Sequence, residues 1–233
     1  MPDIDPQAHR ENVVTQPAEP NRLLHWTLWS ALVLVIFGLM VAYAYRSFQA
    51  ASHNPDVPLP HFQTVPEFAL TERSGRPFSG GELKGKVWVA DFIFTSCSGP
   101  CPLVSARFQE LQQMVERSSD VRLVSFTVDP ETDTPEVLTR YADRLHADPV
   151  KWLFLTGEKS YLYTLIQRHF LLPVTPNPQG ARASEGAVLH STKLVLVDAR
   201  GEVRGFYDGL ATETLPRLLG DIGALLREHG KDR

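Results

Sequence analysis

The sequence predicts an α/β protein in which a mixed β-sheet is flanked by helices and preceded by a single N-terminal transmembrane helix. Three observations lead to this fold class. An apolar run without formal charge covers residues 23–45. Apolar, strand-like runs then alternate with amphipathic helical segments, which is the pattern of βαβ units. Near the end of the chain two strand-like runs follow each other directly, which adds an antiparallel hairpin to the parallel strands.

The composition is that of an ordinary globular protein. Of the 233 residues, 43% are hydrophobic and 21% are charged, so the chain can bury a core without disulfides. The formal net charge of -4 provides no broad basic field, which argues against nucleic acid as a partner.

The first element is the apolar run of residues 23–45, which spans about 34 Å as a helix. That length is sufficient to cross a bilayer. Trp26, Trp29, Tyr43 and Tyr45 lie toward its ends, where aromatic rings prefer the membrane interface. We expect these residues to form a membrane anchor.

The charges beside the run predict its orientation. Arg10 and Arg22 precede it and Arg46 follows, so residues 1–22 are expected to be a cytoplasmic tail. The acidic residues of this tail favour a bacterial anchor over a mitochondrial transit peptide. We therefore expect a single-pass protein of the bacterial cytoplasmic membrane, with its C-terminal domain on the periplasmic side. A cleaved signal peptide is the alternative, because residues 42–44 (Ala-Tyr-Ala) resemble a cleavage site.

Residues 46–61 follow as a proline-rich segment with little apolar periodicity, which predicts an extended tether. His53 and His61 lie in this tether and are expected to be solvated. The remaining residues, 62–233, are expected to form the folded domain.

The domain begins its βαβ pattern with "KVWVADFIF", residues 86–94, and "VRLVSFTV", residues 121–128, two runs typical of strands covered on both faces. Apolar residues at helical spacing predict a helix over residues 101–117 between them. The later elements are expected to be a helix from Thr134 with Pro135 in its first turn, a strand at 152–155, a helix at 159–170, a hairpin of 191–198 and 202–208, and a closing helix around 215–226.

Cys97 and Cys101 are the chain's two cysteines. They fall between the carboxyl end of the first buried strand and the first turn of the following helix, where open α/β sheets place their sites. The helix dipole there predicts that one or both thiols ionise more easily than a free thiol. A structural disulfide would stabilise little, because the ring it closes is short. A redox dithiol and a clip for Cu(I) or zinc both remain open.

A third ligand would decide between them, and His190 is the candidate. It follows a loop rich in proline and glycine, residues 171–188, and precedes a strongly apolar strand. From the mouth of that strand it can reach the cysteine loop if the two strands are close in the sheet. His146 and His169 lie at predicted helix ends, where the dipole alone favours a positive imidazole, and we leave them out of the site.

With "DFIFTSCSGPCP", "VDPETDTPEVLTRYA" and "VLHSTKLVLVDARGEVRGFYDG" in order behind a membrane anchor, the chain resembles the SCO/SenC family of membrane-anchored copper proteins over about residues 62–229. The resemblance implies a thioredoxin-like fold and copper, as Cu(I) or Cu(II), bound by Cys97, Cys101 and His190. It also implies delivery of copper to the binuclear copper centre of cytochrome c oxidase, so the expected partner is the oxidase subunit that carries this centre, or another copper protein. On this interpretation the protein is not an enzyme.

Asp129 matches the acidic residue of the family's V-D-P motif and is a candidate to orient His190 or tune the metal. A turn role beside Pro130 is the alternative, and Asp133 is expected to be only a turn or cap residue. Thioredoxin-like redox enzymes carry a cis-proline before the strand that His190 precedes, whereas this chain has none there, which favours copper. Many family members have proline directly after the first cysteine, whereas this chain reads Ser-Gly-Pro at 98–100, which leaves the client open.

Two alternatives to the copper chaperone remain. One is a membrane-tethered thiol-disulfide reductase that keeps a client's metal-binding cysteines reduced. The other is a zinc protein with the same three ligands.

Overall fold

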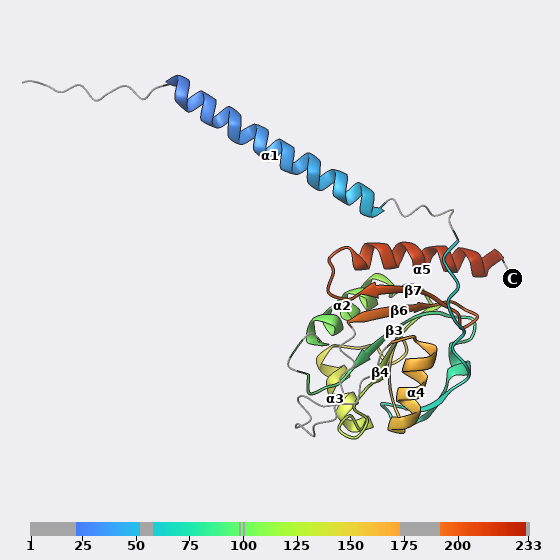
Figure 1. The fold of residues 1–233 in the computed structure, drawn as a ribbon. Helices are drawn as coiled ribbons and strands as arrows, with labels where there is room; N and C mark the ends of the chain where they lie inside the picture. Colours follow the sequence, from blue (N-terminus) through green and yellow to red (C-terminus); the bar gives the residue numbers. More distant parts are fainter. Residues whose placement is uncertain (1–21, 52–57, 98, 100, 173–191, 232–233) are drawn as a thin grey trace, which may run out of the picture. The chain divides into compact units, whose positions relative to one another are not determined.

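The structure is a computed structural model that describes residues 22–51, 58–97, 99, 101–172 and 192–231. The chain divides into two compact units, residues 1–49 and 50–233 (Figure 1). The first unit contains helix α1 (Arg22–Ala51), in which Trp26–Ala44 is long and apolar enough to cross a membrane. This agrees with the membrane-spanning helix expected over residues 23–45.

The second unit is built on a seven-stranded mixed sheet with the strand order β2-β1-β5-β4-β3-β6-β7. Strands β3, β4 and β5 are parallel, and the other neighbouring pairs are antiparallel. The strands are β1 (Ala69–Glu72), β2 (Pro77–Ser79), β3 (Val87–Ile93), β4 (Val121–Thr127), β5 (Trp152–Thr156), β6 (Lys193–Val197) and β7 (Val203–Asp208). All seven residues of β3 are buried, which explains its almost continuous apolar sequence.

Helices cover both faces of this sheet (Figure 1). On one face the apolar sides of α2, α3 and α5 pack around Phe108, Leu138 and Leu218. On the other face α4 packs with Ile166 and Phe170 against aromatic side chains of the central strands. The helices are α2 (Cys101–Met114), α3 (Pro135–Arg144), α4 (Lys159–His169) and α5 (Thr214–Lys231), and a short 3-10 helix, η1 (Gly80–Leu83), follows β2.

The predicted mixed sheet with helices on both faces is therefore confirmed. The start of α3 is also as expected, because the Thr134 hydroxyl caps the helix by accepting from the Val137 amide, and Pro135 occupies the first turn. Strands β1 and β2 and helix η1 were missed by the sequence analysis. They are short, so their sequences carry too few residues to show a period.

The domain also holds the chain immediately before residue 62. Arg204 of β7 is almost completely buried and donates to the backbone carbonyls of Leu59 and Pro60 at 3.0 and 3.1 Å. Its guanidinium pairs with Asp198 at 2.8 Å and Glu228 at 3.2 Å, which balances the buried charge. The packed domain thus includes Leu59 and Pro60, two residues of the segment that the sequence analysis assigns to the tether.

Two features of the sheet position the site. The carboxyl ends of the parallel strands β3 and β4 lie side by side, because Ile93 pairs with Thr127. Strand β6 runs antiparallel beside β3, with Ala90 opposite Val195. The first residues of β6 therefore lie at the edge of the sheet where β3 ends and the cysteine segment begins.

Candidate metal centre

The two cysteines lie where the sequence predicted. Cys97 is in the loop after β3 and Cys101 is the first residue of α2. Both are half-buried and free of disulfides. The Cys97 amide donates to the Phe94 carbonyl at 3.2 Å, which closes a turn in the loop. On the other side, Val104 and Phe108 anchor the first turns of α2 in the core. The pair is therefore attached to the domain from both ends.

The thiol of Cys101 is harder to ionise than expected. Burial raises its pKa to about 12, and a hydrogen-bonding contact with the Cys97 side chain and repulsion from Asp91 act in the same direction. The sequence analysis expected one or both thiols to ionise more easily than a free thiol, and Cys101 is not such a thiol. The reason is that the first residue of α2 is half-buried, and the loss of hydration there disfavours the thiolate. A metal that binds this sulfur has to displace a proton from it.

Asp91 is a buried carboxyl close to the cysteine pair, in the middle of β3 and opposite Ser125 of β4. Among the described residues, neither of its oxygens has a hydrogen-bond partner of regular geometry. Burial raises the pKa of Asp91 to about 7, and an interaction with Ser125 offsets only part of this. The Ser125 hydroxyl also accepts from the Trp152 indole at 2.8 Å.

Further polar groups surround Asp91 on the face of the sheet that α2 and α3 cover. The hydroxyls of Ser105 in α2 and Tyr141 in α3 form a buried hydrogen bond of 2.8 Å. Burial raises the pKa of Tyr141 to about 12, and the charges of Asp91, Cys101 and Cys97 contribute. The sequence contained one signal for this cluster, because Asp91 is the only charged residue in the apolar core of its strand.

The two aspartates after β4 have environments that differ from each other. Asp129 is half-buried, and its backbone amide donates to the Thr127 hydroxyl at 3.0 Å. Asp133 is completely buried and accepts hydrogen bonds from Thr95 in the cysteine loop and from Thr127 in β4. Asp133 is therefore more than the turn or cap residue that the sequence analysis expected.

His190 lies outside the described residues, so its place in the site stays a prediction. The chain re-enters the structure at Thr192, and β6 starts at Lys193 beside the end of β3. Within the described ranges, no three side chains of the His, Cys, Asp and Glu types lie close enough to hold a metal ion.

The other histidines that the sequence analysis considered occupy different places. His146 follows α3 with a positive φ of 52°, and His169, at the end of α4, contacts Gln63 at 3.1 Å. His61 pairs with Glu202 at 2.6 Å, so it has a partner and is not simply solvated as expected. His53 lies outside the described residues.

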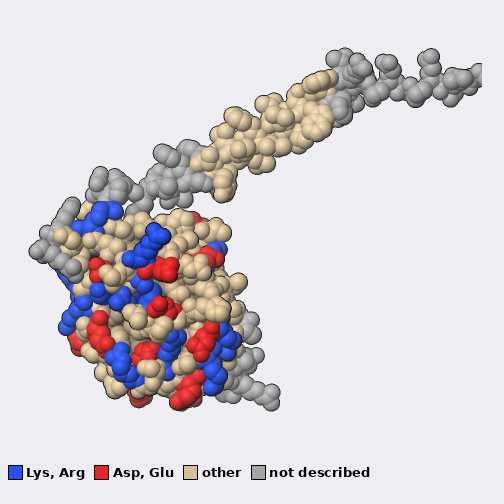
Figure 2. Space-filling model, turned by 180° about the vertical axis from the view of Figure 1, so that it is seen from behind, with Lys and Arg blue, Asp and Glu red and all other residues tan. Residues whose placement is uncertain are grey.

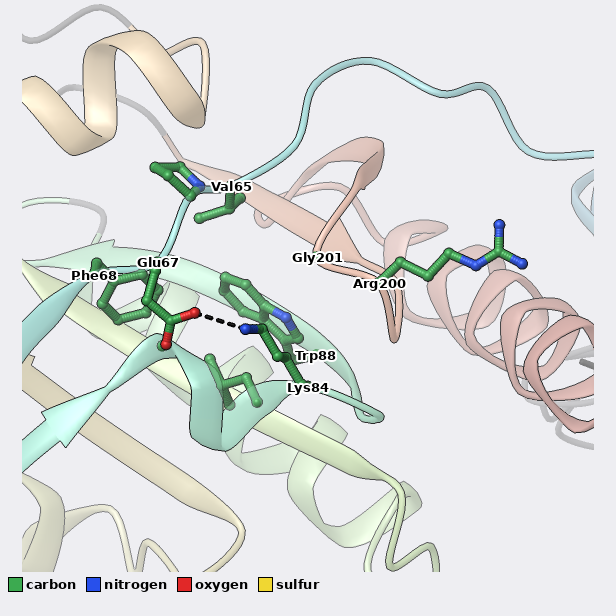
Figure 3. Close-up of a pocket in the computed structure, with 10 residues that line it drawn as sticks. Val65, Glu67, Phe68, Lys84, Trp88, Arg200 and Gly201 are labelled. Carbon is green, nitrogen blue, oxygen red and sulfur yellow. Dashed lines mark ion pairs between the residues drawn. The ribbon is translucent and has the colours of Figure 1, made fainter. Parts of the chain in front are cut away.

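A cavity of about 50 Å³ lies beside Trp88, at the opposite end of β3 from the cysteines (Figure 3). Phe68 and Leu83 line it, and an ion pair of 2.8 Å between Glu67 and Lys84 lies at its edge. Its volume is far below the roughly 300 Å³ at which small-molecule sites begin. Charged side chains of both signs are interspersed over the visible face of the domain (Figure 2). The cysteine edge therefore remains the candidate site.

Comparison with known proteins agrees with this geometry. The SCO1/SenC family matches residues 58–225. The SCO1 protein homolog of Bacillus subtilis is 33% identical over 160 residues, which cover 68% of this chain and 80% of that protein. The structure of BsSco, described as a member of the Sco family of cytochrome c oxidase assembly proteins with a disulfide switch, matches with 30% identity, a TM-score of 0.63, and coverage of 72% of this chain and 98% of that one.

A third match shows the fold. The structure of ScoI from Bradyrhizobium japonicum, solved with copper bound, is 22% identical and has a TM-score of 0.58 over 70% of this chain and 99% of that one. The family match covers nearly the whole of the second unit, including both cysteines and the strand after His190. In this chain the free cysteine pair lies at the carboxyl end of β3, on a thioredoxin-like fold. The chain therefore belongs to the SCO1/SenC family.

Proposed function

We propose that the protein is a membrane-anchored copper chaperone in which Cys97, Cys101 and His190 hold the ion. One observation carries the proposal. On a SCO1/SenC fold, the two free cysteines lie at the sheet edge where β6 begins, three residues after His190. The strand that follows the third ligand is therefore the neighbour of the strand that leads to the first two.

The donor set suits copper. Thiolate sulfur is a soft ligand that favours Cu(I), and imidazole serves either oxidation state. Cys101 lies at the edge of the core, so one ligand is held by a packed helix, while Cys97 is in the preceding loop. A pair of thiols in contact can take up one ion together and can also be closed to a disulfide, which would prevent binding.

The client and the cellular location belong to the same proposal. Relatives named for cytochrome c oxidase assembly support delivery to the oxidase subunit that carries the binuclear copper centre. The apolar helix α1 supports a single-pass anchor in the bacterial cytoplasmic membrane. With residues 1–22 in the cytoplasm, the copper-binding domain faces the periplasm and would meet its client on that side of the membrane.

The change His190→Ala tests the ligand set. We expect it to weaken Cu(I) binding by about tenfold or more, because one of three ligands is lost, while disulfide exchange at the cysteines continues at a similar rate. The measurement is competition for Cu(I) with a chromophoric chelator, made on the full chain in detergent, together with the rate of reduction of a model disulfide.

His146→Asn is the matched control for this variant. His146 is exposed and its positive φ of 52° is one that asparagine tolerates. The control should bind copper as the unchanged protein does. Unchanged copper affinity in His190→Ala with loss of reductase activity would reject the chaperone.

The contact between the Cys97 and Cys101 thiols also supports a second function, a thiol-disulfide reductase that keeps a client's metal-binding cysteines reduced. In that case the electrons come from the two thiols, which become a disulfide as the client's disulfide becomes two thiols. The raised pKa of Cys101 opposes its use as the attacking group, because only a thiolate attacks. Copper binding is the leading proposal because the thiolate and imidazole donors suit copper, whereas disulfide exchange gives His190 no role.

A further inference from the structure

Asp133 connects the cysteine loop to the central sheet. Its carboxylate is completely buried in the turn between β4 and α3. The Thr95 hydroxyl donates to Oδ1 at 2.5 Å, and the Thr95 amide lies 3.2 Å from both oxygens. The Thr127 hydroxyl donates to Oδ2 at 2.6 Å. One side chain thus receives three donors from two segments that are far apart in the sequence.

The donor set requires a carboxylate rather than an amide at this position. A carboxylate only accepts hydrogen bonds, whereas asparagine would place an NH₂ donor against the amide and hydroxyl donors of the two threonines. Burial alone makes a charged group costly, and burial raises the pKa of Asp133 although the threonines lower it. A charge kept at such a place, with all its hydrogen bonds directed at neighbouring segments, fixes geometry more than it adds stability.

The segment that Asp133 holds leads directly to the first cysteine. Thr95 is two residues before Cys97 and lies beyond the last paired residue of β3, so the β-sheet ladder no longer fixes it. Thr127, on the other side of the carboxylate, is the last residue of β4 and is paired with Ile93. The Thr127 hydroxyl also accepts from the Asp129 amide at 3.0 Å, which ties the turn itself to the strand. The carboxylate of Asp133 therefore links the loop that leads to Cys97 to the ordered end of β4.

We propose that Asp133 is the positioning residue of the metal loop: by binding Thr95 it holds the Cys97 thiol beside Cys101 before any metal arrives. The proposal rests on the proposed function for its copper readout. It gives Asp133 a role at the cysteine loop, whereas the role considered for Asp129 in the sequence analysis was to orient His190 or tune the metal. A preorganised pair binds its ion without first ordering the loop, so affinity is higher than for a mobile one.

Two variants and a matched control test this in the full chain in detergent. Asp133→Asn replaces one of the two acceptor oxygens with an NH₂ donor, and Thr95→Val removes only the donor hydroxyl on the cysteine loop. The control is Tyr207→Phe, which removes a hydroxyl that donates at 2.5 Å to another buried carboxylate, Asp221. Tyr207 lies in β7, so this change disturbs a buried hydrogen bond of the same kind without touching the cysteine loop.

The first readout is copper affinity, set beside the melting temperature of each metal-free protein. Asp133→Asn and Thr95→Val should weaken Cu(I) binding by about 10- to 100-fold, the range typical for residues that orient a metal ligand. They should also change the thiolate-to-copper absorption of the Cu(II) form. The control should lower the melting temperature and leave affinity and absorption unchanged.

The second readout does not depend on copper. In glutathione buffers, the two protein thiols and oxidised glutathione exchange to give the Cys97–Cys101 disulfide and two molecules of reduced glutathione. If Asp133 holds the two sulfurs together, Asp133→Asn should lower the equilibrium constant for disulfide formation by about tenfold. The reason is that the effective concentration of one thiol at the other falls when the Cys97 loop is no longer held in place.

The outcomes are distinguishable. A protein that binds no copper but shows this fall refutes the proposed function and keeps the role of Asp133. The positioning role of Asp133 is overturned if Thr95→Val and Asp133→Asn both keep the wild-type Cu(I) affinity and the wild-type disulfide equilibrium. It is also overturned if the control, Tyr207→Phe, loses Cu(I) affinity to the same extent as they do. If Asp133→Asn does not fold, Thr95→Val decides by the same measurements.

Discussion

Replacing Cys97 or Cys101 with serine is expected to weaken copper binding by about 100-fold or more. Structural zinc sites with four protein ligands bind with about 10–16 kcal/mol, or about 3 kcal/mol per ligand on average, and on this scale the loss of one thiolate corresponds to about 100-fold. A serine hydroxyl is a hard ligand that stays protonated at neutral pH, so it does not replace a thiolate toward Cu(I). Competition with a chromophoric Cu(I) chelator, made on the full chain in detergent and under reducing conditions, measures the loss.

The same variants should fold almost as well as the unchanged protein. The cysteines are free, and the disulfide they could form would close a short ring, so it would constrain the unfolded chain very little. We expect the free energy of unfolding of the reduced, metal-free variants to stay within about 1 kcal/mol of wild type. Ser96→Ala, an exposed position in the same loop, is the control that should keep full copper affinity. A large fall in stability for the cysteine variants would indicate a structural role instead.

The elements around the site could be predicted because their sequences are unambiguous. The β3 and β4 segments are mostly apolar, and α2 shows its helical period in Val104, Phe108 and Leu111. Their order placed the cysteines at the carboxyl end of β3 without any knowledge of contacts. Strands β1 and β2, the last two at one side of the sheet, could not be found in this way, because Phe68, Leu70 and Phe78 are buried by partners that are distant in the sequence.

The environment of each site residue was harder to predict than its position. For Cys101 the helix dipole is a local feature that the sequence reveals, whereas burial depends on how α2 packs, and burial decides the pKa. For Asp133 the sequence indicates a turn, and a turn residue is usually exposed. Only the pairing of β3 with β4 brings Thr95 and Thr127 to its carboxylate.

Asp91→Asn is expected to stabilise the metal-free protein at pH 8 by on the order of 2 to 4 kcal/mol and to have little effect at pH 4. The carboxyl titrates near 3.8 in the unfolded chain and at about 7 in the fold, because it is completely buried. Between these values the unfolded chain releases its proton while the folded protein keeps it. Ionisation therefore favours unfolding, and the contribution of Asp91 to stability falls as the pH rises from about 4 to about 7.

The size follows from the two pKa values, because each pKa unit corresponds to about 1.4 kcal/mol, which sets an upper limit of about 4 kcal/mol. Asparagine has almost the same shape as aspartate and no charge to desolvate. The variant should therefore lose the part of the pH dependence of stability that comes from Asp91 and keep the part that comes from the other titrating groups. Urea unfolding at each pH, followed by the fluorescence of the buried Trp88 and Trp152 with reductant and chelator present, gives both curves. Asp129→Asn, at a half-buried carboxyl, is the control and should follow the wild-type curve. If the curves of wild type and Asp91→Asn run parallel from pH 4 to pH 8, Asp91 does not titrate in this range and the Ser125 hydroxyl stabilises its charge after all.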